Sequence, residues 1–197
     1  MPEARPSVTI EGARVVVRRY ELRDAAQLHE AIVRSIEHLR PWMPWVALEP
    51  LELTDREALI GGWITRWEEG EGFNFGVFER GTLVGGCGLN RRVGPAGLEI
   101  GYWTRAGETG RGLATEAAGC LVEAAFAMPA VQFVEVHHDV ANVASGRIPA
   151  HLGFRLIEER EDGPAAPGEA GIERVWRLDR QDWTGRPPHA AIAARSA

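Results

Sequence analysis

The chain has 197 residues, a length that fits one domain and allows a substantial hydrophobic core. Its formal charge of −6 argues against broad binding to nucleic acids or to anionic membranes. No amino-terminal stretch is typical of a signal peptide and no apolar run is long enough to span a bilayer, so we expect a cytoplasmic protein.

The amino-terminal end predicts a β-hairpin followed by a helix. Residues 8–19 are rich in β-branched side chains and have a Glu11-Gly12 turn near their middle. Asp24 suits the N-cap of a helix, and apolar residues then recur at helical spacing as far as Leu39. We therefore expect one continuous helix from Asp24 to Leu39.

A loop stiffened by proline follows, with the sequence Arg40-Pro-Trp-Met-Pro-Trp45. Its two tryptophans, Trp42 and Trp45, are large apolar side chains that are costly to leave in water. They either pack into the core or line a pocket, and the sequence leaves both alternatives open.

A second helix is predicted to run through Trp67 and to end at Gly70–Gly72. Either Thr54 or Asp55 suits its N-cap. The spacing places four residues on one face: Ala58, Leu59, Trp63 and Trp67.

Two strands, at residues 73–78 and 83–90, are predicted to form a hairpin around a turn at 79–82. Glycines at 85, 86 and 88 weaken the second strand and mark either a bulge or a close approach of another backbone. The cysteine in this strand, Cys87, and Cys120 in a later helix are too few for a disulfide framework. We expect both to be small buried residues and not nucleophiles.

The stretch from Leu98 to Cys120 combines a buried strand, a glycine-rich turn and a helix. The strand covers residues 98–104, the turn covers 106–112, and the helix begins near Leu113. Free backbone N–H groups and the helix dipole make such a helix start an anion site. A phosphate is the expected ligand, and the hydroxyl of Thr115 could donate to it.

Two common phosphate-binding patterns fit this stretch poorly. A Walker A loop needs a lysine after its last glycine, whereas Leu113 follows Gly112 and all 22 basic residues of the chain are arginine. A dinucleotide fingerprint needs three glycines, and Gly110 and Gly112 supply two. It also needs an acidic residue near the end of the next strand, and Glu135 lies in the middle of that strand.

The carboxyl-terminal part predicts a strand at 131–139, a short helix from Ser145 to Leu152 and two further strands. The helix is interrupted by Pro149. The strands cover residues 153–158 and 172–178, with an acidic loop at 159–170 between them. This order of elements predicts a mixed α/β fold with a mostly antiparallel central sheet flanked by helices on both faces. We expect one domain over residues 1–183 and a flexible tail over 184–197.

The glycine turn resembles the acetyl-CoA signature of the GNAT superfamily of N-acetyltransferases. That signature is Gln/Arg-x-x-Gly-x-Gly/Ala, and residues 109–114 read Thr-Gly-Arg-Gly-Leu-Ala, with Thr109 at the position of the usual Gln or Arg. Residues 110–117 are most similar to the subfamily that acetylates the N-terminal alanine of ribosomal proteins. Two later segments also resemble the family: Asn142-Val-Ala-Ser145, which matches its Asn-x-x-Ser, and the closing Leu152-Gly-Phe154.

The resemblance implies acetyl-CoA as co-substrate, without a metal. It implies a primary amine as acceptor, either on a small molecule or at a protein N-terminus, with no nucleic-acid or membrane partner. We expect a monomer or a homodimer. The expected coenzyme contacts are Tyr102, Trp103, Thr104, Thr109, Gly110, Arg111, Gly112, Leu113, Ala114, Thr115 and Asn142, and the expected substrate contacts are Trp42 and Trp45.

Amine acetylation needs a base for the amine and an acid for the leaving thiolate. Glu99 is the only charge in its apolar strand and is the first candidate for the base; alternatively it faces solvent. Many members of the family use a tyrosine five residues before the closing phenylalanine, but Pro149 occupies that position here. Ser145 is therefore the candidate acid, acting directly or through water.

Simpler roles stay open for several of these residues. Asn142 or Ser145 could only cap a helix. Either His137 or His138 could serve as an alternative base, but neighbouring strand residues point to opposite faces and do not chelate one metal. The whole chain could also be a non-catalytic acyl-CoA-binding or regulatory module, or a nicotinamide-dependent oxidoreductase.

Overall fold

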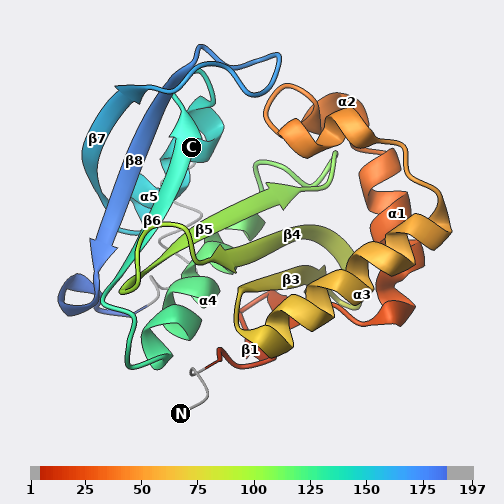
Figure 1. The fold of residues 1–197 in the computed structure, drawn as a ribbon, viewed down its shortest axis with the longest axis horizontal. Helices are drawn as coiled ribbons and strands as arrows, with labels where there is room; N and C mark the ends of the chain where they lie inside the picture. Colours follow the sequence, from red (N-terminus) through yellow and green to blue (C-terminus); the bar gives the residue numbers. More distant parts are fainter. Residues whose placement is uncertain (1–4, 186–197) are drawn as a thin grey trace.

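A computed structural model describes residues 5–185, which build one sheet of eight strands in the order β1-β2-β3-β4-β5-β6-β8-β7 (Figure 1). The strands are β1 (Thr9–Glu11), β2 (Val15–Arg19), β3 (Gly72–Glu79), β4 (Thr82–Asn90), β5 (Gly97–Thr104), β6 (Phe133–Asp139), β7 (Arg155–Glu161) and β8 (Ile172–Asp179). The α-helices are α1 (Ala25–Val33), α2 (Ile36–Leu39), α3 (Leu53–Glu69), α4 (Leu113–Ala127) and α5 (Val143–His151). Short 3-10 helices are η1 (Leu22–Asp24), η2 (Pro44–Leu48) and η3 (Arg180–Asp182).

All neighbouring strands pair antiparallel except β5 and β6, which α4 connects as a parallel pair. That parallel pairing covers only residues 97–99 of β5 and 133–135 of β6. Beyond these residues β5 still pairs with β4, and β6 still pairs with β8, but the two strands no longer pair with each other. The sheet therefore parts between β5 and β6. The predicted mixed, mostly antiparallel fold is confirmed.

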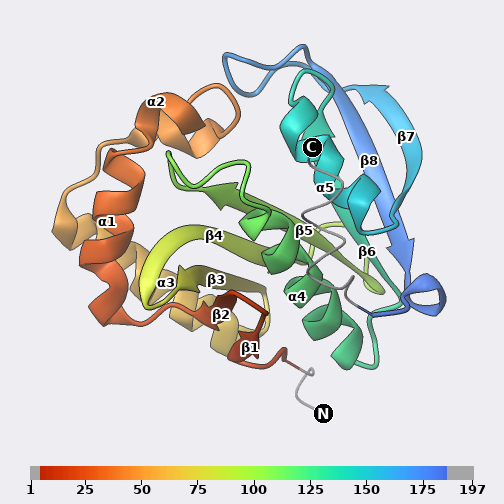
Figure 2. The ribbon, with the colours of Figure 1, turned by 180° about the vertical axis from the view of Figure 1, so that it is seen from behind.

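The helices cover both faces of the sheet. Helix α3 crosses one face in Figure 1, and α4 and α5 lie on the opposite face in Figure 2. Strand β5 serves both layers, because Leu98 and Ile100 join the core under α4 whereas Trp103 packs against the smaller core under α1 and α3. No helix within residues 5–185 is both long and apolar enough to cross a bilayer.

The glycines of β4 mark close approaches, as the sequence predicts. A Cβ on Gly85 would lie 2.4 Å from the carbonyl oxygen of Trp103, and one on Gly86 would lie 2.5 Å from Trp103 Nε1. The register between β3 and β4 also shifts, since Val77 pairs with Gly85 and the next residue pairs with Leu83. The strand therefore carries both predicted features, a bulge and close contacts.

The single helix expected from Asp24 to Leu39 is wrong, because the chain breaks at Arg34–Ser35 between α1 and α2. The Ser35 hydroxyl donates to the Ala31 carbonyl, and such a local bond competes with helix continuation. Asp24 precedes α1 but makes no side-chain cap. Its carboxylate pairs instead with Arg18 at 2.7 Å on β2.

Two smaller boundaries also differ from the predictions. The N-cap of helix α3 is Glu52, before the predicted Thr54 or Asp55, so both of these residues lie inside its first turn. Ala58, which was predicted on the same face as Trp63 and Trp67, is exposed. Strand β7 extends to Glu161, because ion pairs to β8 such as Arg160–Glu173 hold its outer half. The start of the predicted tail, residues 184–185, is irregular, and 186–197 lie outside the described residues.

Candidate active site

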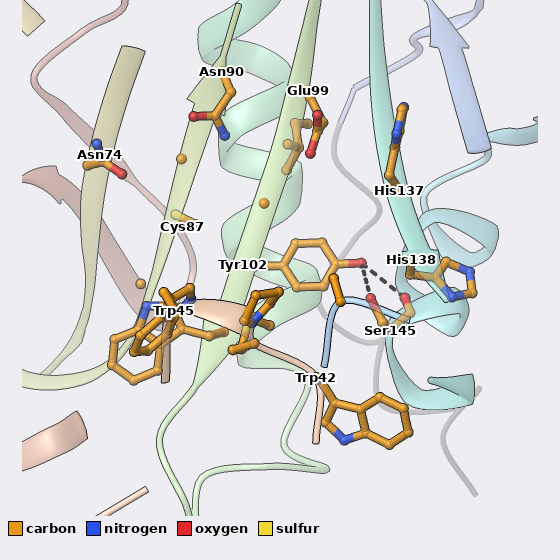
Figure 3. Close-up of a pocket in the computed structure, with 18 of the residues that line it drawn as sticks. Trp42, Trp45, Asn74, Cys87, Asn90, Glu99, Tyr102, His137, His138 and Ser145 are labelled. Atoms are coloured by element: carbon orange, nitrogen blue, oxygen red, sulfur yellow. Dashed lines mark hydrogen bonds between the residues drawn. The ribbon is translucent and has the colours of Figure 1, made fainter. Parts of the chain in front are cut away.

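A cleft of about 950 Å³ opens beside the parted ends of β5 and β6 (Figure 3). Strands β3 to β6 form its floor, and the segment after α2 and the β7–β8 loop contribute to its rim. The fold brings seven of the predicted site residues to this cleft: Trp42, Trp45, Glu99, Tyr102, Trp103, Asn142 and Ser145. The other predicted coenzyme contacts, Thr104 and residues 109–115, form the end of β5, the glycine turn and the start of α4.

The start of α4 has the features of an anion site. Gly112 is its N-cap in a left-handed conformation with φ 75°, and the first helical hydrogen bond runs from the Glu116 N–H to the Gly112 carbonyl. The amides before Glu116 in this turn have no acceptor within the helix. Gly107 and Gly110 are also left-handed, and no atom lies within 4 Å of a Cβ built on either. These residues fit a diphosphate held by backbone N–H groups.

Side chains fix both ends of this loop. Near its end, the Arg111 guanidinium contacts both carboxylate oxygens of Glu79 on β3, at 2.9 and 2.8 Å, and also pairs with Glu108. These bonds, with Glu79 the main cause, raise the pKa of Arg111 above its usual value. At its beginning, the Ala106 N–H donates to the Ser35 hydroxyl at 2.9 Å. The Arg111 guanidinium is thus bound to protein carboxylates, and its backbone N–H remains a predicted phosphate contact.

Where β5 and β6 part, Tyr102 on β5 contacts Ser145 on α5. The Tyr102 hydroxyl donates to the Ser145 carbonyl at 3.0 Å, and the Ser145 hydroxyl donates to the Tyr102 oxygen at 3.3 Å (Figure 3). Burial raises the pKa of Tyr102 above its usual value, against the opposing effect of the Ser145 bond. Tyr102 therefore stays a phenol, and it holds the Ser145 hydroxyl at the gap.

Asn142 caps α5, because its side-chain oxygen accepts the Ser145 N–H at 3.2 Å. The capping interpretation is thus confirmed for Asn142, and it orients the turn that carries Ser145. The sequence predicts Tyr102 only as a coenzyme contact, and the bonds between its phenol and Ser145 were not predicted. A signal was available, because Tyr102 continues the alternation of Leu98 and Ile100 toward the α4 face.

Glu99 lies at the point where the two strands part. It is the last β5 residue in register with β6, opposite Glu135, and it lines the cleft. Its carboxylate accepts a hydrogen bond from Arg92 at 2.8 Å, and its side chain is 12% exposed. The carboxylate is therefore partly exposed to solvent and forms an ion pair with Arg92.

The two histidines of β6 point to opposite faces and have different partners. Each ring nitrogen of His137 lies against a carboxylate, Nε2 at 2.8 Å from Glu135 and Nδ1 at 3.3 Å from Glu173. His138 Nδ1 lies 2.7 Å from the Asp139 carbonyl, and its Nε2 accepts the indole N–H of Trp176 at 3.0 Å. Since a carbonyl only accepts and an indole N–H only donates, His138 is neutral with its proton on Nδ1.

Burial lowers the pKa of His138 and outweighs its hydrogen bond to the Asp139 carbonyl. Both nitrogens of this ring are occupied, so it has no lone pair with which to accept a proton from an amine.

Cys87, opposite Tyr102 in the sheet register, also lines the cleft, and burial raises the pKa of its thiol. Neither cysteine forms a disulfide within residues 5–185, and both are buried as predicted.

The tryptophans after α2 lie on the rim of the cleft. Trp45 packs edge-on against Trp103 with ring centroids 6.3 Å apart, and Trp42 lies below Ser145 in Figure 3. The neighbouring Pro41 carbonyl accepts the N–H of Gly168 at 2.9 Å from the β7–β8 loop. Two segments that are distant in the sequence thus meet at the cleft. Both tryptophans line it, and Trp45 also packs against the smaller core, so both sequence alternatives hold for Trp45.

Asp139, which follows His138, anchors the β7–β8 loop. Its carboxylate accepts three backbone N–H groups where the loop enters β8, from Ala170, Gly171 and Ile172. A fourth comes from Ala141 in the turn after β6. Burial raises its pKa, but these hydrogen bonds outweigh that effect and hold the pKa below its usual range. Charge on this carboxylate therefore stabilises the folded state.

Replacing this anchor tests its contribution. Asp139→Ala should lower the free energy of unfolding by about 2–3 kcal/mol, because four amides lose a charged acceptor in a partly exposed site. Since the folded pKa is depressed, the stabilisation should be complete above about pH 5 and be lost as the pH falls below about 4. Urea titrations at pH 7 and pH 3 would measure both effects. Equal losses for Asp139→Ala and for the exposed Asp162→Ala in the same loop would contradict this role.

Comparison with known proteins agrees with this geometry. The model of the family described as "Acetyltransferase (GNAT) domain" matches residues 14–155. The Bacillus subtilis (strain 168) protein named "Putative ribosomal N-acetyltransferase YdaF" is 27% identical over 177 residues, which cover 87% of this chain and 94% of the relative.

Solved structures share the fold at lower sequence identity. RimJ of Mycobacterium smegmatis in complex with CoA-disulfide superposes with a TM-score of 0.81 at 22% identity, covering 97% of this chain and 96% of RimJ. RimL, a ribosomal L7/L12 alpha-N-protein acetyltransferase in complex with coenzyme A, has a TM-score of 0.81 at 15% identity, covering 88% and 99%. These likenesses show the fold, and the family model covers most of the sequence. The chain therefore belongs to the GNAT acetyltransferase family.

Proposed function

We propose that this acetyltransferase moves the acetyl group of acetyl-CoA to a primary amine by direct attack of the amine, with a protein N-terminus or a small-molecule amine as acceptor. One observation carries the proposal: β5 and β6 part beyond Glu99, between the α4 anion site and the cleft. RimL and RimJ are known in complex with coenzyme A forms, which supports the choice of coenzyme. When bound, acetyl-CoA supplies an activated thioester.

The second half of β5 has one edge available for the coenzyme arm. Residues 102–104 pair with Cys87, Gly86 and Gly85 of β4 on one side. On the other side β6 has diverged, so the main-chain groups there lack a strand partner. Amides of an extended pantetheine arm would satisfy these groups as an added strand does.

The chemistry assigned to the chain is proton transfer. The Glu99 carboxylate accepts a proton from the acceptor amine, directly or through water, and this frees the lone pair that attacks the carbonyl carbon. As the carbon–sulfur bond breaks, the Ser145 hydroxyl gives a proton to the leaving sulfur. The attached nitrogen loses its remaining extra proton to solvent, and Ser145 regains a proton from solvent. The hydrogen bond that Ser145 donates to the Tyr102 oxygen holds its hydroxyl in place.

Trp42 and Trp45 are assigned to acceptor binding, because both line the cleft on the side away from α4. An N-terminal α-amine is the acceptor we favour, since the relatives RimL and YdaF are named for ribosomal substrates. Such a substrate would place the protein in the cytoplasm, and we expect it to act there as a monomer or a homodimer.

Acetyl-CoA turnover with a panel of peptides and small amines tests the proposal. Release of CoA thiol that depends on an added amine, with a matching acetyl mass increment on that amine, is the expected result. Tight CoA binding without transfer to any acceptor would instead support a non-catalytic acyl-CoA-binding module. Where transfer occurs, kcat/KM from acceptor concentration curves would rank the α-amines of peptides against small amines.

Ser145→Ala should lower kcat about a hundredfold or more with little change in the KM for acetyl-CoA, because a general acid contributes to the chemical step. Tyr102→Phe is the companion variant, since it removes the hydroxyl that holds Ser145. Steady-state kinetics of both variants, with circular dichroism to verify folding, provide the measurement. If Ser145→Ala retains the parent kcat, Ser145 has only a structural role.

A further inference from the structure

Ser35 occupies a junction between the two halves of the site. It is fully buried at 0% exposure between α1 and α2. Its hydroxyl donates to the Ala31 carbonyl at 2.6 Å and accepts the Ala106 N–H at 2.9 Å. One hydroxyl thus ties the end of α1 to the loop over residues 105–112, which we call the coenzyme loop.

The main chain of the same residue continues toward the cleft. The Ser35 carbonyl accepts the Leu39 N–H at 2.8 Å, and the Leu39 carbonyl accepts the N–H groups of Trp42 and Met43 at 2.9 Å. A short run of hydrogen bonds therefore leads from Ala106 through Ser35 to Trp42. Residues 36–48, which carry both rim tryptophans, are here called the acceptor segment.

A second contact joins the same two regions. The Arg105 guanidinium lies 3.5 Å from the Glu30 carboxylate of α1, and the Arg105 N–H donates to the Val84 carbonyl. The beginning of the coenzyme loop is thus held by α1 on one side and by β4 on the other. The Arg105–Glu30 pair is partly exposed at 3.5 Å, whereas the Ser35 side chain is fully buried and bonds to Ala106 at 2.9 Å. The Ser35 hydroxyl is therefore the stronger tether.

We propose that Ser35 is a positioning residue that couples coenzyme binding at the coenzyme loop to ordering of the acceptor segment. The inference rests on the proposed function, because it takes CoA as the ligand of the α4 site. The Ala106–Ser35 bond is either made or broken, and a ligand that fixes the loop favours the made state. By linkage, an ordered acceptor segment in turn favours coenzyme binding.

Hydrogen exchange on the full chain, with and without CoA, tests this coupling directly. Saturating CoA should slow amide exchange in residues 105–115, which form the ligand site. It should also slow exchange in residues 36–48, which the proposed diphosphate site does not include. Protection confined to residues 105–115 would overturn the coupling while leaving the proposed function intact, and absence of any CoA binding would overturn both.

Ser35→Ala separates a tether from a general structural role. The variant should bind CoA about tenfold more weakly, because the partly buried Ala106 N–H loses its acceptor and the loop must be ordered on binding. At saturating CoA, residues 105–115 should still gain protection, whereas residues 36–48 should not. Retained protection of residues 36–48 in this variant would contradict the role of Ser35.

Ile60→Val is the matched control, since Ile60 is fully buried in the same small core and does not line the cleft. It should lower the melting temperature to a similar degree while leaving both CoA affinity and the protection of residues 36–48 unchanged. A second variant, Ser35→Cys, keeps a similar volume but offers only a weak acceptor. It should fall between Ser35→Ala and the parent protein in CoA affinity, and parent-like affinity would count against the tether.

Discussion

Gly112→Glu is expected to weaken CoA binding at least a hundredfold, a loss of about 2.7 kcal/mol or more. Gly112 caps α4 at φ 75°, a conformation that costs a residue with a Cβ roughly 1 kcal/mol. The new carboxylate would also lie near the free amides of the helix start. There it would compete with a diphosphate for the positive end of the helix dipole and repel it electrostatically. Isothermal titration with CoA would measure the loss.

Gly94→Glu provides a control matched in backbone conformation and charge. Gly94 is also left-handed, with φ 97° and no atom within 4 Å of a built Cβ. It lies in the turn before β5, at the opposite end of that strand from the start of α4. This variant should show similar strain in its melting temperature with CoA affinity close to the parent value. Comparable affinity losses in both variants would reject the α4 start as the diphosphate site.

Glu99→Gln should lower kcat/KM for the amine about a hundred- to a thousandfold near neutral pH, within the range expected for loss of a general base. The amide has nearly the shape of the carboxylate but does not accept a proton. The deficit should shrink as the pH rises, because a growing fraction of the acceptor then arrives as the free amine. The pH dependence of kcat/KM for parent and variant is the decisive measurement.

Arg92→Gln distinguishes catalysis from structural pairing, since Arg92 is the partner of Glu99 at 2.8 Å. If Glu99 matters only through this ion pair, both variants should lose the same activity. We expect Arg92→Gln to lower kcat/KM less than tenfold, because the Glu99 carboxylate that accepts the proton is retained and Arg92 itself is largely exposed. If the pH profile of kcat/KM is identical for the parent and for Glu99→Gln, Glu99 does not act as the base.

Local sequence patterns determined most of the secondary structure and the position of the turn and helix start that we propose as the anion site. The alternation of Leu98 and Ile100, the glycines at 110 and 112 and the helical spacing after Leu113 each act within a few residues. Such short-range signals depend on backbone sterics and on side-chain periodicity, which a single sequence displays. The strand, loop and helix they predicted are β5, the coenzyme loop and α4.

Helix and strand ends were less determined, because they depend on partners elsewhere in the chain. Asp24 has the side chain of a helix cap, yet it pairs with Arg18 on β2. Apolar spacing predicted one helix through Ser35, but its hydroxyl also serves the Ala106 amide 71 positions away. At Asp24 a tertiary contact outweighed a local preference, and at Ser35 the local bond to Ala31 acts together with the contact to Ala106.

Only the tertiary structure decided which side chains share the site. The sequence singled out Ser145 and Glu99, but the parting of β5 from β6 beyond Glu135 places Tyr102 against Ser145, 43 positions away. It also decided that His138 is neutral, through the donor Trp176 on β8. Periodicity tells which face of a strand a side chain occupies, whereas its partner depends on how distant strands diverge and pack, and no local pattern records that.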